Sequence, residues 1–212
     1  MSTARTELVA AAARLAELGL SPGSSGNVSV REGEEIVMSP TGADLAALDA
    51  ERLSVLDDAG TLLAGPRASK EFPLHRAFYR RDPAFTAIVH LHSACASAVS
   101  CLAPWSERSA LPPITPYFVM RVGQTPLVPY ADPGDPAQAE SIERLAWPFR
   151  AALLANHGLV VAGRTVAEAL DAAIELEEAS KLLLLLGDRP IRTLEESDAV
   201  RLGERYGSPW GG

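Results

Sequence analysis

Two of the four histidines in this 212-residue chain stand two positions apart in an apolar segment, residues 87–93. The segment reads Ala-Ile-Val-His-Leu-His-Ser, and its β-branched and apolar residues predict a buried strand. Alternate side chains of a strand share a face, so His90 and His92 would lie about 7 Å apart at Cα on the same side. That spacing suits two imidazoles on one metal ion. The alternative is that each ring packs in the core.

A third histidine lies in a short polar turn between two apolar segments. His157 is flanked by Asn156 and Gly158, and we expect Gly158 to adopt a positive φ that brings the backbone close to a ligand. Three protein ligands and one open position are typical of catalytic zinc. Manganese, cobalt or nickel suit the same donors. The alternative is that His157 only caps a hairpin.

Glu71 is the candidate acid or base, because it stands where a loop meets a predicted helix. The alternative is a glutamate placed there by the favourable helix dipole. His75 follows four residues later, and it either supports the site from behind or packs beside Tyr79.

Three small polar turns could each hold an anion. They contain Gly26 and Asn27, the segment Ser39-Pro40-Thr41-Gly42, and the pair Ser69-Lys70. Backbone N–H groups beside glycine, with hydroxyls nearby, form phosphate sites without a Walker loop. Such clusters are often only turns. Next to a metal site, they indicate a phosphorylated substrate.

The elements that must position these residues can be read from hydrophobic periodicity and from capping residues. Helices are expected over residues 3–18, 93–102, about 72–81, 135–147, 165–186 and 193–207, the last two beginning at Thr165/Glu168 and Thr193/Glu196 capping boxes. Strands are expected over 28–31, 35–39, 53–56, 61–63, 87–93, 151–155 and 159–162, whereas 111–130 gives no clear assignment. We expect one α/β domain over residues 1–212, with a largely antiparallel sheet and helices on its faces.

Composition excludes several classes of protein. The net charge of −8 argues against nucleic-acid binding and against docking on an anionic membrane. No apolar run reaches the roughly 18 residues that span a bilayer, and no signal peptide precedes the first helix, so we expect a cytoplasmic protein. Cys95 and Cys101 fall on different faces of one predicted helix, and we expect two buried, unpaired thiols.

Five motifs together resemble the class II aldolase/adducin family over residues 5–190. They are Ser25-Gly26-Asn27, Ser39-Pro40-Thr41-Gly42, Ser69-Lys70-Glu71, His90-Leu91-His92-Ser93 and Asn156-His157-Gly158. The resemblance implies a three-layer head fold and a homotetramer with the site at subunit interfaces. By the resemblance, zinc would be held by three residues, His90, His92 and His157. Glu71 would be the catalytic carboxylate, able to ligate the metal when no substrate is present.

The same resemblance assigns the remaining site residues. Phosphate would be held by Asn27, Thr41, Gly42, Ser69 and Lys70. Tyr117 matches the position where a neighbouring subunit's tyrosine donates a proton in the aldolase.

The sugar-phosphate aldolases usually have a second serine at the position of Lys70. Here Ser69-Lys70-Glu71, residues 115–118 and residues 130–135 resemble a branch that decarboxylates 3-oxo-tetronate 4-phosphate to dihydroxyacetone phosphate and CO2. A β-keto acid loses CO2 when its carbonyl is polarised, and a cation held by neutral imidazoles can stabilise the resulting enediolate. A ketose-phosphate aldolase or 4-epimerase, of the fuculose-1-phosphate or ribulose-5-phosphate type, is the alternative. A more remote one is an adducin-like interaction domain, although such heads lack the metal ligands.

Overall fold

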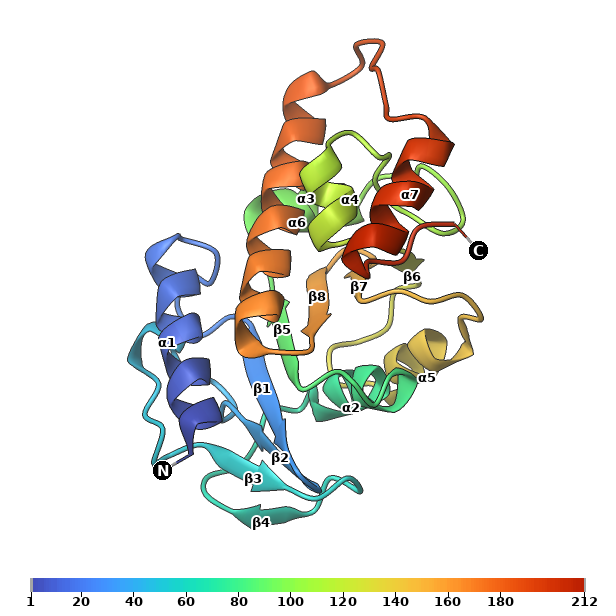
Figure 1. The fold of residues 1–212 in the computed structure, drawn as a ribbon. Coiled ribbons are helices and arrows are strands. Elements are labelled where there is room, and N and C mark those ends of the chain that lie inside the picture. The colour runs from blue at the N-terminus through green and yellow to red at the C-terminus, as the bar shows by residue number, and fades with distance from the viewer. Residues whose placement is uncertain (1, 212) are drawn as a thin grey trace.

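The computed structural model describes residues 2–211, which form eight strands and seven α-helices (Figure 1). The strands are β1 (Asn27–Glu32), β2 (Glu35–Met38), β3 (Ser54–Leu56), β4 (Leu62–Ala64), β5 (Ala87–Leu91), β6 (Leu127–Val128), β7 (Ala151–Leu154) and β8 (Gly158–Gly163). The helices are α1 (Thr3–Glu17), α2 (Phe72–Arg81), α3 (Ala94–Ser100), α4 (Pro116–Arg121), α5 (Pro136–Arg144), α6 (Val166–Leu186) and α7 (Glu196–Tyr206).

All eight strands form one sheet in the order β4-β3-β2-β1-β5-β8-β7-β6. Every neighbouring pair is antiparallel except β6 and β7, which run parallel. The predicted largely antiparallel α/β sheet is therefore confirmed. The two hairpins expected from the acidic and glycine-containing turns form β1–β2 and β3–β4.

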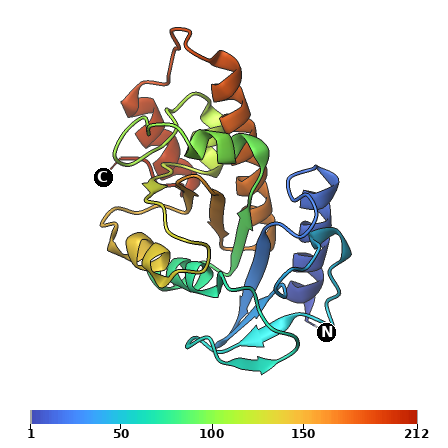
Figure 2. The same ribbon diagram turned by 180° about the vertical axis from the view of Figure 1, so that it is seen from behind.

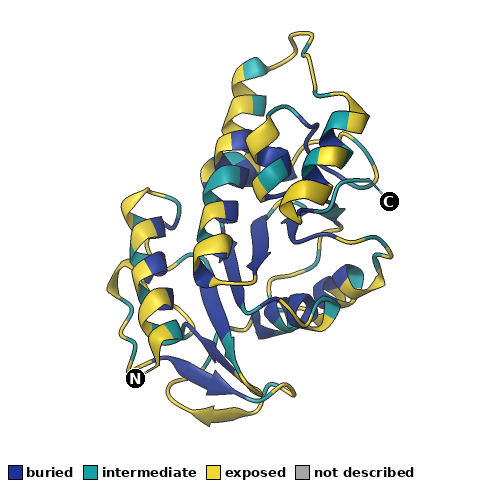
Figure 3. Cartoon of the chain, in the orientation of Figure 1, coloured by how far each residue is buried: buried dark blue, intermediate teal, exposed yellow. Residues whose placement is uncertain are grey.

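Helices cover both faces of the sheet and give three layers. The alternation of β5 shows why: Val89 and Leu91 enter the core shared with α1, α3, α4 and α6, whereas Ile88 enters the core shared with α2 and α5. Figures 1 and 2 show α2 and α5 side by side. The central strands are buried throughout, while the outer faces of the helices and the edge strand β4 are exposed (Figure 3).

The register of the sheet brings three strand ends together at one edge. Asn27, the first residue of β1, pairs with His90 near the end of β5, and Leu91 pairs with Leu159 near the start of β8. Because these strands are antiparallel, the end of β5 meets the beginnings of its two neighbours. The side chain of His90 lies on the same face as Ile88, toward α2.

The structure corrects the predicted start of the last helix. Thr193 and Glu196 form no capping box: α7 begins at Glu196, and Glu195 at the N-cap makes no side-chain hydrogen bond. The preceding Leu194 N–H donates to the carbonyl of Pro113 instead, which holds this segment extended. Within the unassigned residues 111–130, the chain forms α4 and the short β6.

The prediction of two buried thiols is wrong. Cys95 is half-buried and Cys101 is exposed, although both are free as expected. Helix α3 buries Ala96, Val99 and Ser100, so its other positions face outward. None of the helices in residues 2–211 combines the length and the apolar character needed to cross a membrane.

Candidate metal centre

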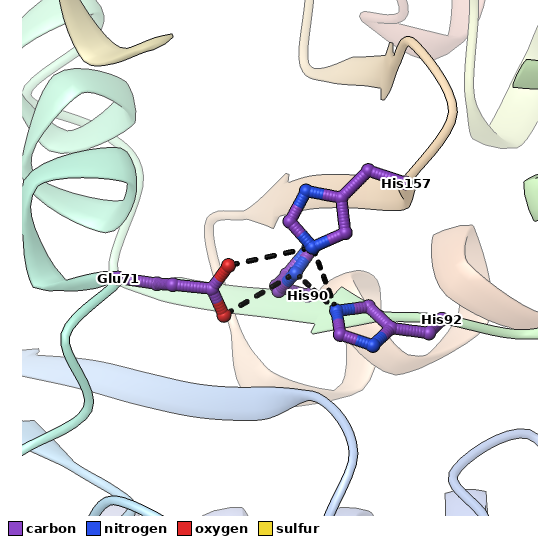
Figure 4. Close-up of side chains that lie close together, drawn as sticks. All are labelled: Glu71, His90, His92 and His157. Carbon is purple, nitrogen blue, oxygen red and sulfur yellow. Dashed lines mark hydrogen bonds and ion pairs between the residues drawn. The ribbon is translucent and has the colours of Figure 1, made fainter. Parts of the chain in front are cut away.

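Three imidazoles and one carboxylate converge at the edge of the sheet where β5 ends (Figure 4). The Nε2 atom of His92 lies 3.0 Å from that of His90 and 2.9 Å from that of His157. Glu71 faces this group, with Oε2 3.5 Å from His90 Nε2 and Oε1 3.4 Å from His157 Nε2. One ligand atom from each of the four residues lies within 4.8 Å of all the others.

Three local features place these four side chains. His90 is the fourth residue of β5, and His92 follows the end of that strand. His157 lies in the turn between β7 and β8, and Glu71 is the N-cap residue of α2. A single strand, a tight turn and a helix start thus supply the four ligand atoms.

The turn that holds His157 differs from its prediction. Gly158 does not adopt a positive φ; Asn156 does, with φ 58°. Asparagine tolerates this left-handed conformation better than most residues. Gly158 is required for another reason, because a Cβ there would lie 2.2 Å from the carbonyl oxygen of Leu91 on β5. Its lack of a side chain brings β8 close to β5, rather than bringing the backbone close to a ligand.

The hydrogen bonding of His90 fixes which nitrogen is free. Its Nδ1 lies 2.7 Å from the carbonyl oxygen of Leu159, so Nδ1 carries the proton and donates it there. The lone pair of Nε2 then points at the other two rings. A backbone carbonyl on the second nitrogen is the usual way in which a metal-binding histidine is oriented.

The residues fit a divalent cation. Unprotonated nitrogens about 3 Å apart repel each other unless a cation or a proton lies between them. Ligand nitrogens on a tetrahedral zinc lie about 3.3 Å apart, close to the distances of 3.0 and 2.9 Å from His92 Nε2 to the Nε2 atoms of His90 and His157. Glu71 Oε1 is buried and has no hydrogen-bond partner among the described residues, and a cation at this position would satisfy it. Imidazole donors suit zinc, manganese, cobalt and nickel.

Burial keeps the rings in the form that binds metals. It lowers the pKa of His92 and of His157 to about 4, with a further contribution from the neighbouring His90. Burial alone would raise the pKa of Glu71, but His90, Asn27 and His157 outweigh it and hold that pKa well below its usual range. At neutral pH the His92 and His157 rings are therefore neutral, and Glu71 is ionised.

Glu71 is held from behind by a buried network of hydrogen bonds, of which the sequence suggested only a supporting role for His75. Asn27 Nδ2 donates to Glu71 Oε2 at 2.7 Å, and Asn27 Oδ1 lies 2.6 Å from His75 Nε2. His75 Nδ1 lies 2.7 Å from the hydroxyl of Ser29, which lies 2.8 Å from that of Tyr79. Both earlier interpretations of His75 hold, because it lies behind Glu71 and beside Tyr79. The i, i+4, i+8 spacing of the α2 residues could have suggested this.

Glu177 of α6, which the sequence did not single out, anchors the chain directly after His92. Its buried carboxylate accepts hydrogen bonds from the Ser93 hydroxyl at 2.7 Å, the Cys95 N–H at 2.9 Å and the Ala96 N–H at 2.8 Å. Ser93 occupies the N-cap position of α3 as predicted, but its side chain does not cap the helix. The carboxylate of Glu177 takes that role from a distant helix.

The other end of α3 holds the turn that carries His157. The Ser97 hydroxyl donates to the His157 carbonyl at 2.9 Å, and the His157 N–H donates to the Ser100 hydroxyl at 3.2 Å. The Asn156 N–H donates to the Ser100 carbonyl at 3.1 Å. Helix α3 thus connects the segment after His92 to the backbone of His157.

The remaining predicted anion-binding residues lie on two adjacent turns. The Thr41 N–H donates to the carbonyl of Arg67, and Pro40 pairs with Ala68, so the turns containing Gly42 and Ser69 are neighbours. The Ser69 hydroxyl accepts from the Glu71 N–H at 3.3 Å. Thr41, Gly42 and Lys70 are exposed, whereas Asn27 is buried.

Two further observations concern the predicted substrate-facing residues Lys70 and Tyr117. The stem of Lys70 passes so close to Gly134 that a Cβ there would lie 3.2 Å from it. Tyr117 lies on α4 with 58% of its surface exposed and its ring centroid 5.7 Å from the Arg121 guanidinium carbon. No hydrogen bond or ring contact within residues 2–211 joins Tyr117 to the metal-binding group.

Comparison with known proteins gives consistent matches. Residues 6–184 match the profile of the class II aldolase and adducin N-terminal domain. The chain is 45% identical over 200 residues to 3-oxo-tetronate 4-phosphate decarboxylase of Pectobacterium atrosepticum, covering 94% of this chain and 92% of that protein. It is 30% identical to L-fuculose phosphate aldolase of Escherichia coli, covering 91% and 88%. The crystal structure of YgbL from Klebsiella pneumoniae superposes with a TM-score of 0.89 at 44% identity, covering 94% and 97%.

Proposed function

Because the chain belongs to the class II aldolase and adducin N-terminal domain family, we propose that it is a metal-dependent carboxy-lyase. Its substrate would be 3-oxo-tetronate 4-phosphate, and its products dihydroxyacetone phosphate and CO2. The observation that carries the proposal is the convergence of three imidazole Nε2 atoms with the Glu71 carboxylate. The relatives that bear the decarboxylase name are also more similar to this chain than those that bear the aldolase name.

The metal would be held by His90, His92 and His157, with Glu71 next to it. A divalent cation bound there would supply the positive charge that stabilises an enediolate when CO2 leaves. Zinc is the proposed ion because neutral imidazoles are its usual ligands in catalytic sites.

Glu71 is the proposed proton donor. When the bond between the carboxylate carbon and C2 of the substrate breaks, its electron pair remains on C2, and C2 then takes up one proton. Glu71 is ionised in the free site, so it would first take up a proton when the negatively charged substrate binds beside it, because a nearby negative charge raises the pKa of a carboxylate. It would then deliver that proton to C2. Tyr117 of a neighbouring subunit is the alternative donor, and its exposure in the single chain is consistent with that role.

The anionic ends of the substrate would be bound by the polar turns beside Glu71. We assign the phosphate to Asn27, Thr41, Gly42, Ser69 and Lys70, which lie beside the start of α2. Thr41, Gly42 and Lys70 are exposed, whereas Asn27 is buried and its side-chain amide already contacts Glu71 and His75. Lys70 could instead meet the substrate carboxylate. In a chain with a net charge of −8, this lysine supplies a local positive charge for either group.

The proposal includes the state of the whole molecule. We expect one domain over residues 1–212, a cytoplasmic location, and a homotetramer with its active sites at the subunit interfaces. Size-exclusion chromatography with light scattering would test the tetramer directly.

The decisive experiment measures turnover of both stereoisomers of 3-oxo-tetronate 4-phosphate. Dihydroxyacetone phosphate is detected with a coupled dehydrogenase, and CO2 is measured separately, because an aldolase would also release a ketose phosphate fragment. L-fuculose 1-phosphate and ribulose 5-phosphate serve as the comparison substrates. Stoichiometric CO2 release with loss of activity in Glu71→Gln supports the proposal, whereas aldehyde release without CO2 favours the aldolase.

A further inference from the structure

A buried line of hydrogen bonds ends on Glu71. It begins at the Tyr79 hydroxyl and passes through Ser29, His75 and Asn27, with successive donor–acceptor distances between 2.6 and 2.8 Å. The side chains of Ser29 and His75 are fully buried, and those of Tyr79, Asn27 and Glu71 are nearly so. Water therefore cannot substitute for a missing partner without entering the core.

The ionised Glu71 carboxylate, at one end of this line, determines the donor and the acceptor in each of its hydrogen bonds. An ionised Glu71 only accepts, so the Asn27 amide must present its NH2 group to the carboxylate and its oxygen to His75. That oxygen also only accepts, so His75 Nε2 must carry the proton. Nδ1 of the neutral ring then accepts from the Ser29 hydroxyl, which in turn accepts from Tyr79.

We propose that His75 is a positioning residue for Glu71: as a neutral ring protonated on Nε2, it locks the Asn27 amide in the orientation that donates to Glu71 Oε2. The consequence for Glu71 rests on the proposed function of that carboxylate. With the amide locked, the carboxylate is held facing the three imidazoles. Without a donor at His75 Nε2, the Asn27 amide is free to turn its oxygen toward Glu71 and repel it.

The surroundings of His75 favour the neutral ring that this hydrogen bond to Asn27 requires. Complete burial, and then the nearby His90, lower the pKa of the ring to about 3. His90 is the opposite case, because its Nδ1 donates to a backbone carbonyl. The two histidines should therefore be opposite tautomers in one protein.

Two amide substitutions distinguish the orienting hydrogen bond from His75 to Asn27 from a role in packing alone. In His75→Gln, the amide nitrogen reaches the position of the ring Nε2 and can still donate to Asn27. In His75→Asn, the shorter side chain reaches only the position of Nδ1. We expect kcat to fall about tenfold or more in His75→Asn, with KM and metal content unchanged, and to remain within about threefold of wild type in His75→Gln.

A second measurement needs no substrate. Long-range ¹H–¹⁵N correlation spectra of the metal-free protein at pH 7 should show His75 neutral with its proton on Nε2 and His90 with its proton on Nδ1. The His75 signals are those lost in His75→Gln. A protonated His75 or the Nδ1–H tautomer would overturn the proposal, as would equal kcat in the two amide variants at equal stability. If the wild-type protein releases no CO2, the proposed function fails, and the spectra still decide the orientation of Asn27.

Discussion

Replacing Glu177 should destabilise the protein through three hydrogen bonds that a single buried carboxylate accepts. The carboxylate accepts at 2.7–2.9 Å from one hydroxyl and two backbone N–H groups at the start of α3. In Glu177→Gln, one oxygen can still accept, but the amide NH2 then faces an N–H donor. Because a hydrogen bond to a charged group is worth about 1.5–3 kcal/mol, losing one of the three should lower the free energy of unfolding by about that amount.

Glu177→Ala should have a larger effect, because it leaves all three donors without their acceptor. We expect a loss of about 3–5 kcal/mol, which is a large fraction of the roughly 5–15 kcal/mol by which a folded domain is usually stable. The assay is urea unfolding of the metal-free protein, followed by circular dichroism. Glu178→Gln is the matched control, since Glu178 is exposed and only faces Lys181 at 3.7 Å; it should change stability by less than about 0.5 kcal/mol.

Glu177→Gln should also weaken metal binding. Helix α3 begins just after His92 and holds the backbone of His157, so a displaced helix moves two of the three imidazoles. We expect the zinc affinity of Glu177→Gln to fall about tenfold in a competition titration with a chromogenic chelator. Equal urea midpoints and equal zinc affinities for Glu177→Gln and Glu178→Gln would refute the structural role of Glu177.

Four further predictions concern the site. His92→Ala should lose bound metal and turnover, because this ring lies about 3 Å from both others; elemental analysis showing one metal per chain would contradict it. Lys70→Ser should raise KM about tenfold with metal content unchanged, and unchanged steady-state kinetics would remove Lys70 from the site. Gly158→Ala should cost about 2 kcal/mol or more in urea unfolding, since the added Cβ meets the Leu91 carbonyl at 2.2 Å. The pKa of His75 is lowered from 6.5 to about 3, so below pH 6.5 the unfolded chain gains a proton there and the folded protein does not. Between pH 7 and 5 the free energy of unfolding of the metal-free wild type should therefore fall by about 2 kcal/mol more than that of His75→Gln. Equal losses in the two proteins would contradict this.

Much of the fold follows from local patterns in the sequence. Helix α6 begins at a Thr165 cap, ends at Gly187 with positive φ, and matches its predicted bounds because both signals are local. The strand carrying His90 was also predicted to within a residue or two. The segment 111–130 was not assigned, although Thr115 caps α4 with Pro116 at its first position, because its proline and aromatic content hides a helix of six residues.

The candidate site likewise has features that local sequence patterns predict and features that depend on the tertiary fold. The step of two residues between His90 and His92 is visible in the sequence, since a strand projects alternate residues to one face. The line from Tyr79 to Glu71 depends on how β1 pairs with β5 and on how α2 packs over β1, which no local pattern contains. Glu177 lies on a helix predicted only as a helix. Its contacts with α3 require the tertiary fold.

The pairing of β5 with β8 has a consequence for how this chain can vary in length. A single residue inserted in β5 before His90 would turn His90 and His92 together to the opposite side of the sheet, toward α6, and separate both from His157 and Glu71. The turn between β3 and β4 carries no such register constraint, because it joins β3 to the edge strand β4, and β3 is separated from β5 by two strands in the sheet order. Natural insertions and experimental peptide tags should therefore be accepted at that turn and rejected within a few residues of His90.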